Sequence, residues 1–159
     1  MADPNHTAPT EDLDWPQARH GRHPFNPASE MKMVGLGALT GMARIGVNLI
    51  RIPSGKESFV PHAHALEEEC VFILSGAGQV VLDGAPHAVG PGDFVCFPID
   101  GVVHSLVNTG DEDLVYLTAG QRSAVEVAHM PTIGKTAVFR PRRISMMGDA
   151  GVEELTVEE

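Results

Sequence analysis

The feature of this sequence that most constrains its fold is a series of short apolar runs separated by turn-forming residues. The runs recur at a spacing of about ten residues with Gly, Pro and Asp between them, which is the pattern of short antiparallel strands. Strands at such even spacing are typical of a β-sandwich or β-barrel. The sequence predicts strands at Gly46–Ile52, Cys70–Leu74, Gln79–Leu82, Phe94–Phe97, Val102–Val107 and Leu114–Thr118. Only Leu36–Ile45 is a candidate helix, and its glycines weaken that prediction.

The length of 159 residues predicts a single domain that can bury a hydrophobic core. Because no internal repeat is visible, we expect one barrel, spanning residues 31–121. Residues 1–30 are rich in proline and lack apolar periodicity, which indicates an extension along the surface, held in place by Trp15 and Phe25.

The C-terminal segment, residues 122–159, is expected to form a second extension that serves as a dimerisation arm. Within it, residues 138–144 are basic and compatible with a strand. The basic run at 140–143 is interpreted as a solvated or interface-lining edge, with anion binding as the alternative. Residues 151–159 form an acidic tail that we expect to fray.

The charge balance argues against several classes of partner. Twenty-one acidic side chains against eleven basic ones give a formal charge of -10, which repels nucleic acids and anionic membrane surfaces. No apolar run approaches the ~18 residues of a membrane-spanning helix, so a cytoplasmic protein is expected. Cys70 and Cys96 do not form a CxxC pair and lie in apolar runs, which favours buried, inert thiols.

A histidine pair and a glutamate carry the first chemical signal. Residues two apart on a strand point to the same face, so His62 and His64 can direct two imidazoles to one site. Glu69 begins the next strand and shares its face with Val71 and Ile73. A carboxylate that faces an apolar interior is costly without a partner, and a metal ion is such a partner.

A third histidine, His104, follows another strand and turn, so that a barrel would bring it opposite the first hairpin. Three neutral imidazoles and one carboxylate leave a divalent ion with a net charge of about +1. In octahedral geometry, roughly two coordination positions then stay open for water or substrate. The donors are nitrogen and oxygen without thiolate. We therefore expect one divalent transition metal per chain, Mn, Fe, Ni or Zn, bound by His62, His64, Glu69 and His104.

Other side chains compete for these roles. Glu68 is the alternative carboxylate, but strand parity and the spacing to Gly76 favour Glu69. Arg51 and Tyr116 lie on strands near the motifs, and their orientation is left open. No catalytic residue is identified, and no role is assigned to His6, His20, His23, His87 and His129.

These residues fall into two motifs that resemble those of the cupin superfamily. The first motif, Gly, His-x-His, Glu and Gly, is matched by Gly55, His62, His64, Glu69 and Gly76, with one extra residue after Gly55. The second motif, Gly, Pro-x-Gly, His and Asn, is matched by Gly92, Pro98, Gly101, His104 and Asn108, with one extra residue between Pro98 and Gly101. The resemblance covers roughly residues 46–120.

The resemblance implies a single-domain jelly-roll β-barrel, also called a double-stranded β-helix, with N- and C-terminal extensions. It also implies frequent dimers, here a homodimer, and the same four residues as metal ligands. The segments GVNLIRIPSG, DFVCFP and DEDLVYL look like the small bacterial cupins of the sugar-phosphate-isomerase-like group. Asn108 and the motif glycines are expected to be structural.

Two function hypotheses follow. The first is a metal-dependent enzyme that acts on a small oxygen-rich metabolite as an isomerase, lyase or dioxygenase. The alternative is a non-catalytic cupin that binds or senses a small polar molecule. No helix-turn-helix segment precedes the barrel, so a DNA-binding regulator is not expected.

Overall fold

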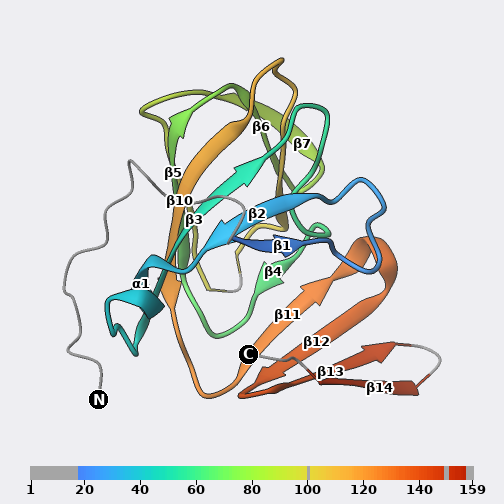
Figure 1. Ribbon diagram of the computed structural model, residues 1–159. Helices are drawn as coiled ribbons and strands as arrows, with labels where there is room; N and C mark the ends of the chain where they lie inside the picture. The colour runs from blue at the N-terminus through green and yellow to red at the C-terminus, as the bar shows by residue number, and fades with distance from the viewer. Residues whose placement is uncertain (1–17, 100, 149–150, 157–159) are drawn as a thin grey trace.

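The structure, a computed structural model, describes residues 18–99, 101–148 and 151–156. Within these residues it is a nearly all-β jelly roll built from two facing walls (Figure 1). A one-turn helix, α1 (Leu36–Leu39), and a 3-10 turn, η2 (Pro131–Ile133), are the helical elements of this part of the chain. The candidate helix is thus confirmed only over its first turn.

The first wall is a six-stranded sheet in the order β1-β2-β3-β10-β5-β8. Neighbouring strands in it are antiparallel, and Tyr116 of β10 lies opposite Ile50 of β3 and Ile73 of β5. The strands are β1 (Arg19–Gly21), β2 (Met31–Val34), β3 (Ile45–Ile52), β10 (Leu114–Gln121), β5 (Glu69–Ser75) and β8 (Phe94–Phe97).

The second wall has a barrel part and a C-terminal part. The barrel part pairs β7 (Ala85–Val89), β6 (Gly78–Leu82) and β9 (His104–Val107). The loop before the two-residue strand β4 (Ala63–His64) contacts β9 through isolated β-bridges, one of which joins His62 to His104. Strand β4 pairs with β11 (Glu126–Met130), which continues into β12 (Lys135–Arg140), β13 (Arg143–Gly148) and β14 (Gly151–Thr156).

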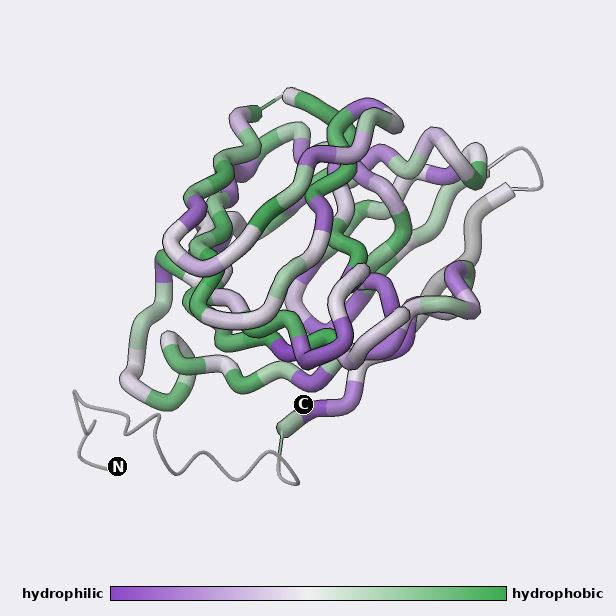
Figure 2. Tube along the Cα trace, turned by 90° about the horizontal axis from the view of Figure 1, so that it is seen from above, coloured by the Kyte–Doolittle hydropathy of each residue, from purple (hydrophilic) through white to green (hydrophobic). Residues whose placement is uncertain are grey.

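Two hydrophobic clusters hold these layers together. The larger one fills the barrel and includes Ile52, Ile73, Phe97, Leu114 and Tyr116, each 2% exposed or less. Burial of side chains of this size stabilises a fold by about 1.5–3 kcal/mol each. The smaller cluster lies under the C-terminal strands and consists of Val60, Ala128, Met130, Ala137 and Met146. Figure 2, seen from above, shows apolar stretches (green) along the chain that are interrupted by polar residues (purple).

The expected strands all form, with ends shifted by up to three residues. The basic run at 138–144 is the end of β12, a turn and the start of β13. The prediction of a fraying tail is wrong for Gly151–Thr156, because its backbone pairs with β13 along its whole length. Phe25 packs against the smaller cluster as expected, whereas Trp15 lies outside the described residues.

The prediction of two buried thiols is also wrong. Cys70 is half-buried and Cys96 is exposed. They face each other across β5 and β8, on the outer side of the six-stranded sheet beside Phe72 and Phe94. An apolar run alone does not tell which side of a sheet each residue faces.

Asn108 and Gly76 have the structural roles expected of them. The Asn108 amide donates to the carbonyls of Ile52 and Glu112, 2.8 Å away in each case, which joins two strand ends. Gly76 has φ +79°, and a Cβ there would stand 2.3 Å from the Asp113 carbonyl. Only glycine fits this turn.

Among the described residues, no helix has both the length and the apolar character that crossing a membrane requires.

Candidate metal centre

Four side chains from separate segments converge at one end of the barrel. His62 and His64 come from the stretch that leads into and forms β4, Glu69 begins β5, and His104 begins β9. One potential ligand atom from each of the four lies within 4.8 Å of those of the others. Glu68, the alternative carboxylate, is exposed, so the structure places Glu69 and not Glu68 in this cluster.

His62 and His104 are joined by their own backbones. The amide of His62 donates to the carbonyl of His104 at 3.1 Å, and the amide of His104 donates to the carbonyl of His62 at 2.8 Å. Each imidazole then donates from Nδ1 to the carbonyl two residues earlier, Val60 at 2.8 Å and Val102 at 3.1 Å. A carbonyl can only accept, so both rings carry their proton on Nδ1 and leave Nε2 as a lone-pair donor.

The His104 ring is held in one plane. Phe97 stacks on it with ring centroids 3.6 Å apart and planes 4° apart. Its Nε2 atom is buried, has no hydrogen-bond partner among the described residues, and lies 3.6 Å from Glu69 Oε2, beyond hydrogen-bond distance. A buried lone pair without a partner is costly, and a cation satisfies it.

Glu69 is held as an ionised carboxylate. Burial opposes its charge, but His104, His64 and Thr118 beside it lower its pKa well below the usual range. The Thr118 hydroxyl donates to Oε1, and His64 Nε2 lies 3.1 Å from Oε2. The carboxylate therefore keeps its charge at any physiological pH.

His64 is held by carboxylates instead of carbonyls. Glu126, buried on β11, places Oε1 3.4 Å from His64 Nδ1 and accepts the backbone amide of Ala65 at 3.1 Å. Burial lowers the pKa of His64, but Glu69 and Glu126 together raise it above its ordinary value. By contrast, burial and the neighbouring His104 lower the pKa of His62 to about 4.

Glu126 and Thr118 contact the cluster directly, and neither was predicted from the sequence. Glu126 shares its strand face with Ala128 and Met130, which are both buried. A lone carboxylate on an apolar strand face is the same signal that identified Glu69. Glu126 was not predicted because the regular spacing of short apolar runs ends before β11.

A cavity of about 400 Å³ opens onto the centre. Its walls come from the N-terminal segment, the loop before β4 and the C-terminal strands, and they include His62, His64 and Glu69. Most of the remaining lining is apolar: Phe25, Phe59, Ala128, Met130, Phe139, Ile144 and Met146. Deeper in the barrel only about 30 Å³ is left, so a ligand would approach from the cavity side.

The other residues that the sequence left open fall in different places. Tyr116 faces the barrel interior beneath the cluster, and Arg51 forms an ion pair with Asp113 at 3.3 Å. His23 lines the cavity, a position that its sequence context did not indicate. His20, His87 and His129 are exposed, and His6 lies outside the described residues.

The donor set fits a divalent transition metal ion. Two Nε2 atoms with fixed protonation, a third imidazole and an ionised carboxylate surround a common point, and all are nitrogen or oxygen donors. His62, His64, Glu69 and His104 could therefore hold one such ion, with room on the cavity side for further ligands.

Comparison with known proteins agrees with this geometry. The family model of the cupin domain matches residues 48–120. Protein SchB of Streptomyces halstedii is 34% identical over 98 residues, which is 60% of this chain and 67% of that protein.

Solved structures extend the likeness over nearly the whole chain. A proposed sugar phosphate isomerase from Acidithiobacillus ferrooxidans is 31% identical with a TM-score of 0.84, covering 96% of this chain and 97% of that one. A sugar phosphate isomerase of the cupin superfamily from Silicibacter pomeroyi is 26% identical with a TM-score of 0.68, covering 91% of each chain. The chain therefore belongs to the cupin superfamily, as one of its small single-domain members.

Proposed function

We propose that this cupin is a metal-dependent enzyme that acts on a small oxygen-rich metabolite. In this proposal His62, His64, Glu69 and His104 bind one divalent transition metal, Mn, Fe, Ni or Zn. The observation that carries it is the pair of backbone-fixed imidazoles, His62 and His104, whose Nε2 atoms are left beside the half-buried carboxylate of Glu69. Such fixed protonation, supplied by surrounding hydrogen bonds, is typical of histidines that ligate metals.

The metal would supply Lewis acidity toward a substrate with adjacent oxygen atoms. The chain's own residues supply the environment for that chemistry. Glu69 and Glu126 provide negative charge on the His64 side, while the carbonyls of Val60 and Val102 accept the Nδ1 protons of the other two imidazoles and leave their Nε2 atoms for the centre. The apolar lining of the cavity excludes water from the bound substrate.

Isomerisation is the reaction type that the relatives favour, since two of the most similar solved structures carry a sugar phosphate isomerase name. The proposal also includes lyase and dioxygenase reactions. Each type other than dioxygenation needs a group that moves a proton. Among the described residues lining the cavity, Arg22 and His23 are the ionisable side chains outside the metal cluster. His23 is the one whose ordinary pKa lies near neutral pH, and burial lowers that pKa, which favours the neutral imidazole that can accept a proton.

The test has two stages. Elemental analysis of protein never exposed to chelators, and again after reconstitution, should find about one metal per chain; finding none in either sample contradicts the proposal. Metal-loaded protein is then assayed with sugar phosphates, keto acids and enediols. Oxygen uptake with iron indicates a dioxygenase, whereas product formation without oxygen and with zinc or manganese indicates an isomerase or lyase. His23→Gln should lower kcat and leave metal content unchanged.

The alternative is a binding cupin that holds a small polar molecule without converting it. The engagement of both Glu69 oxygens supports it, because this carboxylate is not free to act as a base. Denaturing the purified protein and identifying the released molecule separates the two proposals. Release of an unchanged ligand, together with inactivity on the panel above, favours the binding cupin.

We also propose that the protein forms a homodimer through the outer face of the six-stranded sheet. Phe72, Leu74 and Phe94 are exposed there by 42%, 42% and 63%, next to the sheet edge at β8. Exposed apolar side chains grouped in this way commonly mark interaction surfaces. Two copies that each carry a charge of -10 would repel one another least across this apolar patch.

The dimer is tested by light scattering coupled to gel filtration. The unchanged protein should have the mass of two chains, and Phe94→Lys should reduce it to one. His87→Lys adds the same charge to an exposed strand of the opposite wall and should leave the dimer intact. A monomeric unchanged protein, or a Phe94→Lys variant that still dimerises, contradicts this choice of surface.

A further inference from the structure

Two cysteines face each other across neighbouring strands on the outer side of the six-stranded sheet. Cys70 of β5 lies directly opposite Cys96 of β8 in the antiparallel pairing. The first is half-buried, the second is exposed, and both thiols are free. They are the two cysteines that the sequence contains. The thiols of the whole chain are therefore gathered at one place, and neither belongs to the metal cluster.

The hydrogen bonds of this strand pair determine how closely the two side chains approach. Opposite residues of an antiparallel pair alternate between hydrogen-bonded and non-hydrogen-bonded pairs, and the side chains are closer in the second kind. The amide of Ile73 donates to the carbonyl of Asp93 at 3.0 Å, so these opposite residues form a hydrogen-bonded pair. Cys70 lies an odd number of residues before Ile73 in the same register. Cys70 and Cys96 are therefore a non-hydrogen-bonded pair.

This position is suited to a disulfide. The Cα atoms of a non-hydrogen-bonded pair are about 4.5 Å apart. A disulfide spans Cα atoms about 4.4–6.8 Å apart, so the two cysteines lie within this range, near its short end. A bond between them needs only a small movement of the strands. Because closure at the short end stores strain, such a bond is easier to reduce than an unstrained structural disulfide.

The exposure of the two cysteines assigns them different roles in the reaction with a peroxide. The exposed Cys96 sulfur attacks one peroxide oxygen and the O–O bond breaks, which gives a sulfenic acid and, with hydrogen peroxide, one water molecule. The Cys70 sulfur then attacks the sulfenic sulfur, the S–O bond breaks, and a second water molecule leaves. Two thiols thus lose two hydrogen atoms with their electrons, and the peroxide is reduced.

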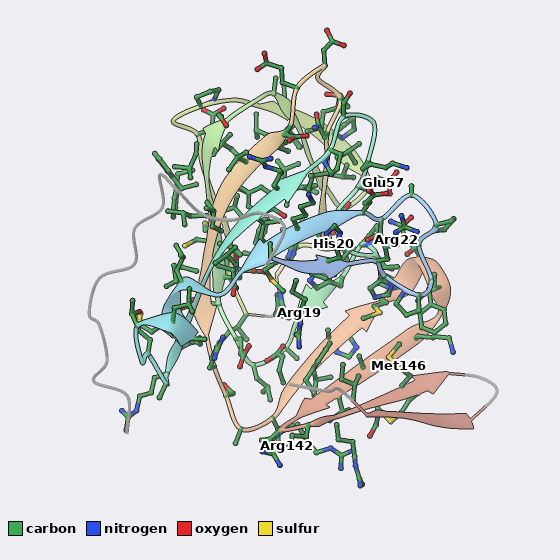
Figure 3. All side chains as sticks on the ribbon, in the orientation of Figure 1. Arg19, His20, Arg22, Glu57, Arg142 and Met146 are labelled. Carbon is green, nitrogen blue, oxygen red and sulfur yellow. The ribbon has the colours of Figure 1, made fainter. Side chains whose placement is uncertain are left out.

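The cysteine pair and the cavity lie on different sides of the metal centre. Figure 3 shows Arg22 after β1 and Met146 on β13, and both line the cavity that opens onto the cluster. Cys70 and Cys96 instead point away from the barrel interior, beside exposed side chains of β5 and β8. An oxidant therefore reaches Cys96 without passing through the cavity.

Strand β8 connects the cysteine pair to the metal centre. It is four residues long and stands at the end of the sheet order, so β5 is its one neighbour within the described sheet. Phe97, which follows Cys96, lies opposite Glu69 and stacks on the ring of His104 with centroids 3.6 Å apart. A covalent bond from Cys96 to β5 would fix this edge strand and hold the Phe97 ring against His104.

We propose that Cys70 and Cys96 form a reversible cross-strand disulfide on reaction with a peroxide, and that this bond slows the release of metal by fixing Phe97 against His104. The first part stands on the strand pairing alone. The second part rests on the proposed function, because it needs a metal bound at the cluster.

The first experiment treats reduced, metal-free protein with a small excess of hydrogen peroxide. Titration of the denatured protein should fall from two thiols per chain to none, and the mass should fall by two hydrogen atoms. Digestion at acidic residues should release a linked pair of peptides, because Asp83 and Asp93 lie between the two cysteines. A reductant should restore both thiols.

The matched control moves one thiol along the same face of β8. In Cys96→Ser/Phe94→Cys the new thiol lies diagonal to Cys70, at about 7–8 Å, which is more than a disulfide spans. This variant should give far less internal disulfide than the unchanged protein. An equal yield contradicts the argument from strand pairing.

The two cysteines lie on the face through which we propose that two chains pair, so the same treatment is applied to Phe94→Lys, in which that pairing should be lost. An internal disulfide in the unchanged protein or in Phe94→Lys supports the proposal. Its absence from both proteins, or a disulfide that joins two chains in place of an internal one, contradicts it.

The second experiment tests the link to the metal centre with zinc, which has no redox chemistry of its own. Oxidised protein should lose zinc to an excess of chelator about threefold more slowly or slower still than protein reduced with a phosphine, because a residue that supports a ligand is held in place. Cys70→Ser/Cys96→Ser should lose zinc at one rate before and after peroxide treatment.

Equal rates for oxidised and reduced protein contradict the link through Phe97. Protein that takes up no zinc or other metal contradicts the proposed function, and the thiol titration of metal-free protein still decides whether the disulfide forms.

Discussion

The two sides of the metal centre are built by different means. On the barrel side, His62 and His104 are fixed by backbone carbonyls and by their own reciprocal amide bonds. On the side of the C-terminal strands, His64 is placed between two carboxylates, Glu69 and Glu126. Uncharged backbone groups orient the imidazoles on the first side, whereas charged side chains orient the imidazole on the second side.

The difference shows which ligands are positioned by the barrel of the superfamily fold and which by the C-terminal strands. Backbone carbonyls come with the barrel itself, and no single side-chain substitution removes them. Glu126 depends on β11 reaching β4, so it belongs to the part of the chain beyond the match to the cupin domain. The C-terminal strands can therefore tune the centre without changing the barrel.

The largest effect should come from the barrel side. His104→Ala removes one of the two fixed Nε2 donors, so metal affinity should fall by orders of magnitude while the barrel still folds. A metal that binds only the native state at a thousandfold excess over Kd stabilises it by about 4 kcal/mol. For a chain of this size that corresponds to about 10 °C in Tm, which the variant should lose. Elemental analysis and melting curves with and without metal measure both effects.

The control for this substitution is His87→Ala, on an exposed strand away from the cluster. It should retain the metal and the metal-dependent gain in Tm. Equal metal content in both variants contradicts the ligand set, and metal loss in Glu68→Gln but not in Glu69→Gln contradicts the register of β5.

An intermediate effect is expected on the charged side. Glu126→Gln keeps the shape of the side chain but removes the negative charge beside His64 Nδ1. Loss of such a supporting carboxylate typically weakens metal binding by about 10–100-fold. Glu67→Gln removes a nearby charge whose hydrogen bond goes to the backbone amide of Ser123, and it is the matched control. If competition with a chelating dye shows equal affinities for the two variants, the comparison of the two sides fails.

Acidification should also distinguish the two sides in the metal-free protein. As pH falls below 7, His64 should take up a proton first because its pKa is raised, whereas His62 should stay neutral until about pH 4. Between about pH 6.5 and 4, His62 binds a proton in the unfolded chain but not in the folded chain. The free energy of unfolding that depends on His62 therefore decreases as the pH is lowered through this range. Protonated His64 acts in the opposite direction, and its contribution is lost as pH rises above its folded pKa.

Ring nitrogen shifts in NMR report the order of protonation directly, with His64→Gln used for assignment. A His62 ring that titrates before His64 contradicts the assignment of neutral and chargeable sides.

The smallest effect is expected from Thr118→Val, which keeps the shape of the side chain and removes the hydroxyl that donates to Glu69. One lost hydrogen bond to a charged group is worth about 1.5–3 kcal/mol, part of which the bound metal recovers. We expect a loss of affinity several times smaller than that of Glu126→Gln, together with a rise in the Glu69 pKa. A larger loss than that of Glu126→Gln contradicts this order of effects.

The barrel and the cluster were accessible to sequence reasoning because their signals are local. Parity along β5 distinguishes Glu69 from Glu68, and turn residues mark most strand ends. Other features depend on pairing between distant segments, which no local pattern contains: Glu126 reaches His64 only because β11 pairs with β4. Strand β7 was missed because its residues APHAV are almost all exposed and include Pro86, so that it has no apolar run.

The reciprocal backbone bonds between His62 and His104 have a consequence for folding kinetics. These residues are far apart in the sequence, so their imidazoles meet only after a large loop has closed, at a cost in chain entropy. Metal capture should therefore be a late step. The refolding rate should be insensitive to metal concentration, while the unfolding rate should fall as metal is added, because the ion stabilises contacts that are absent from the transition state.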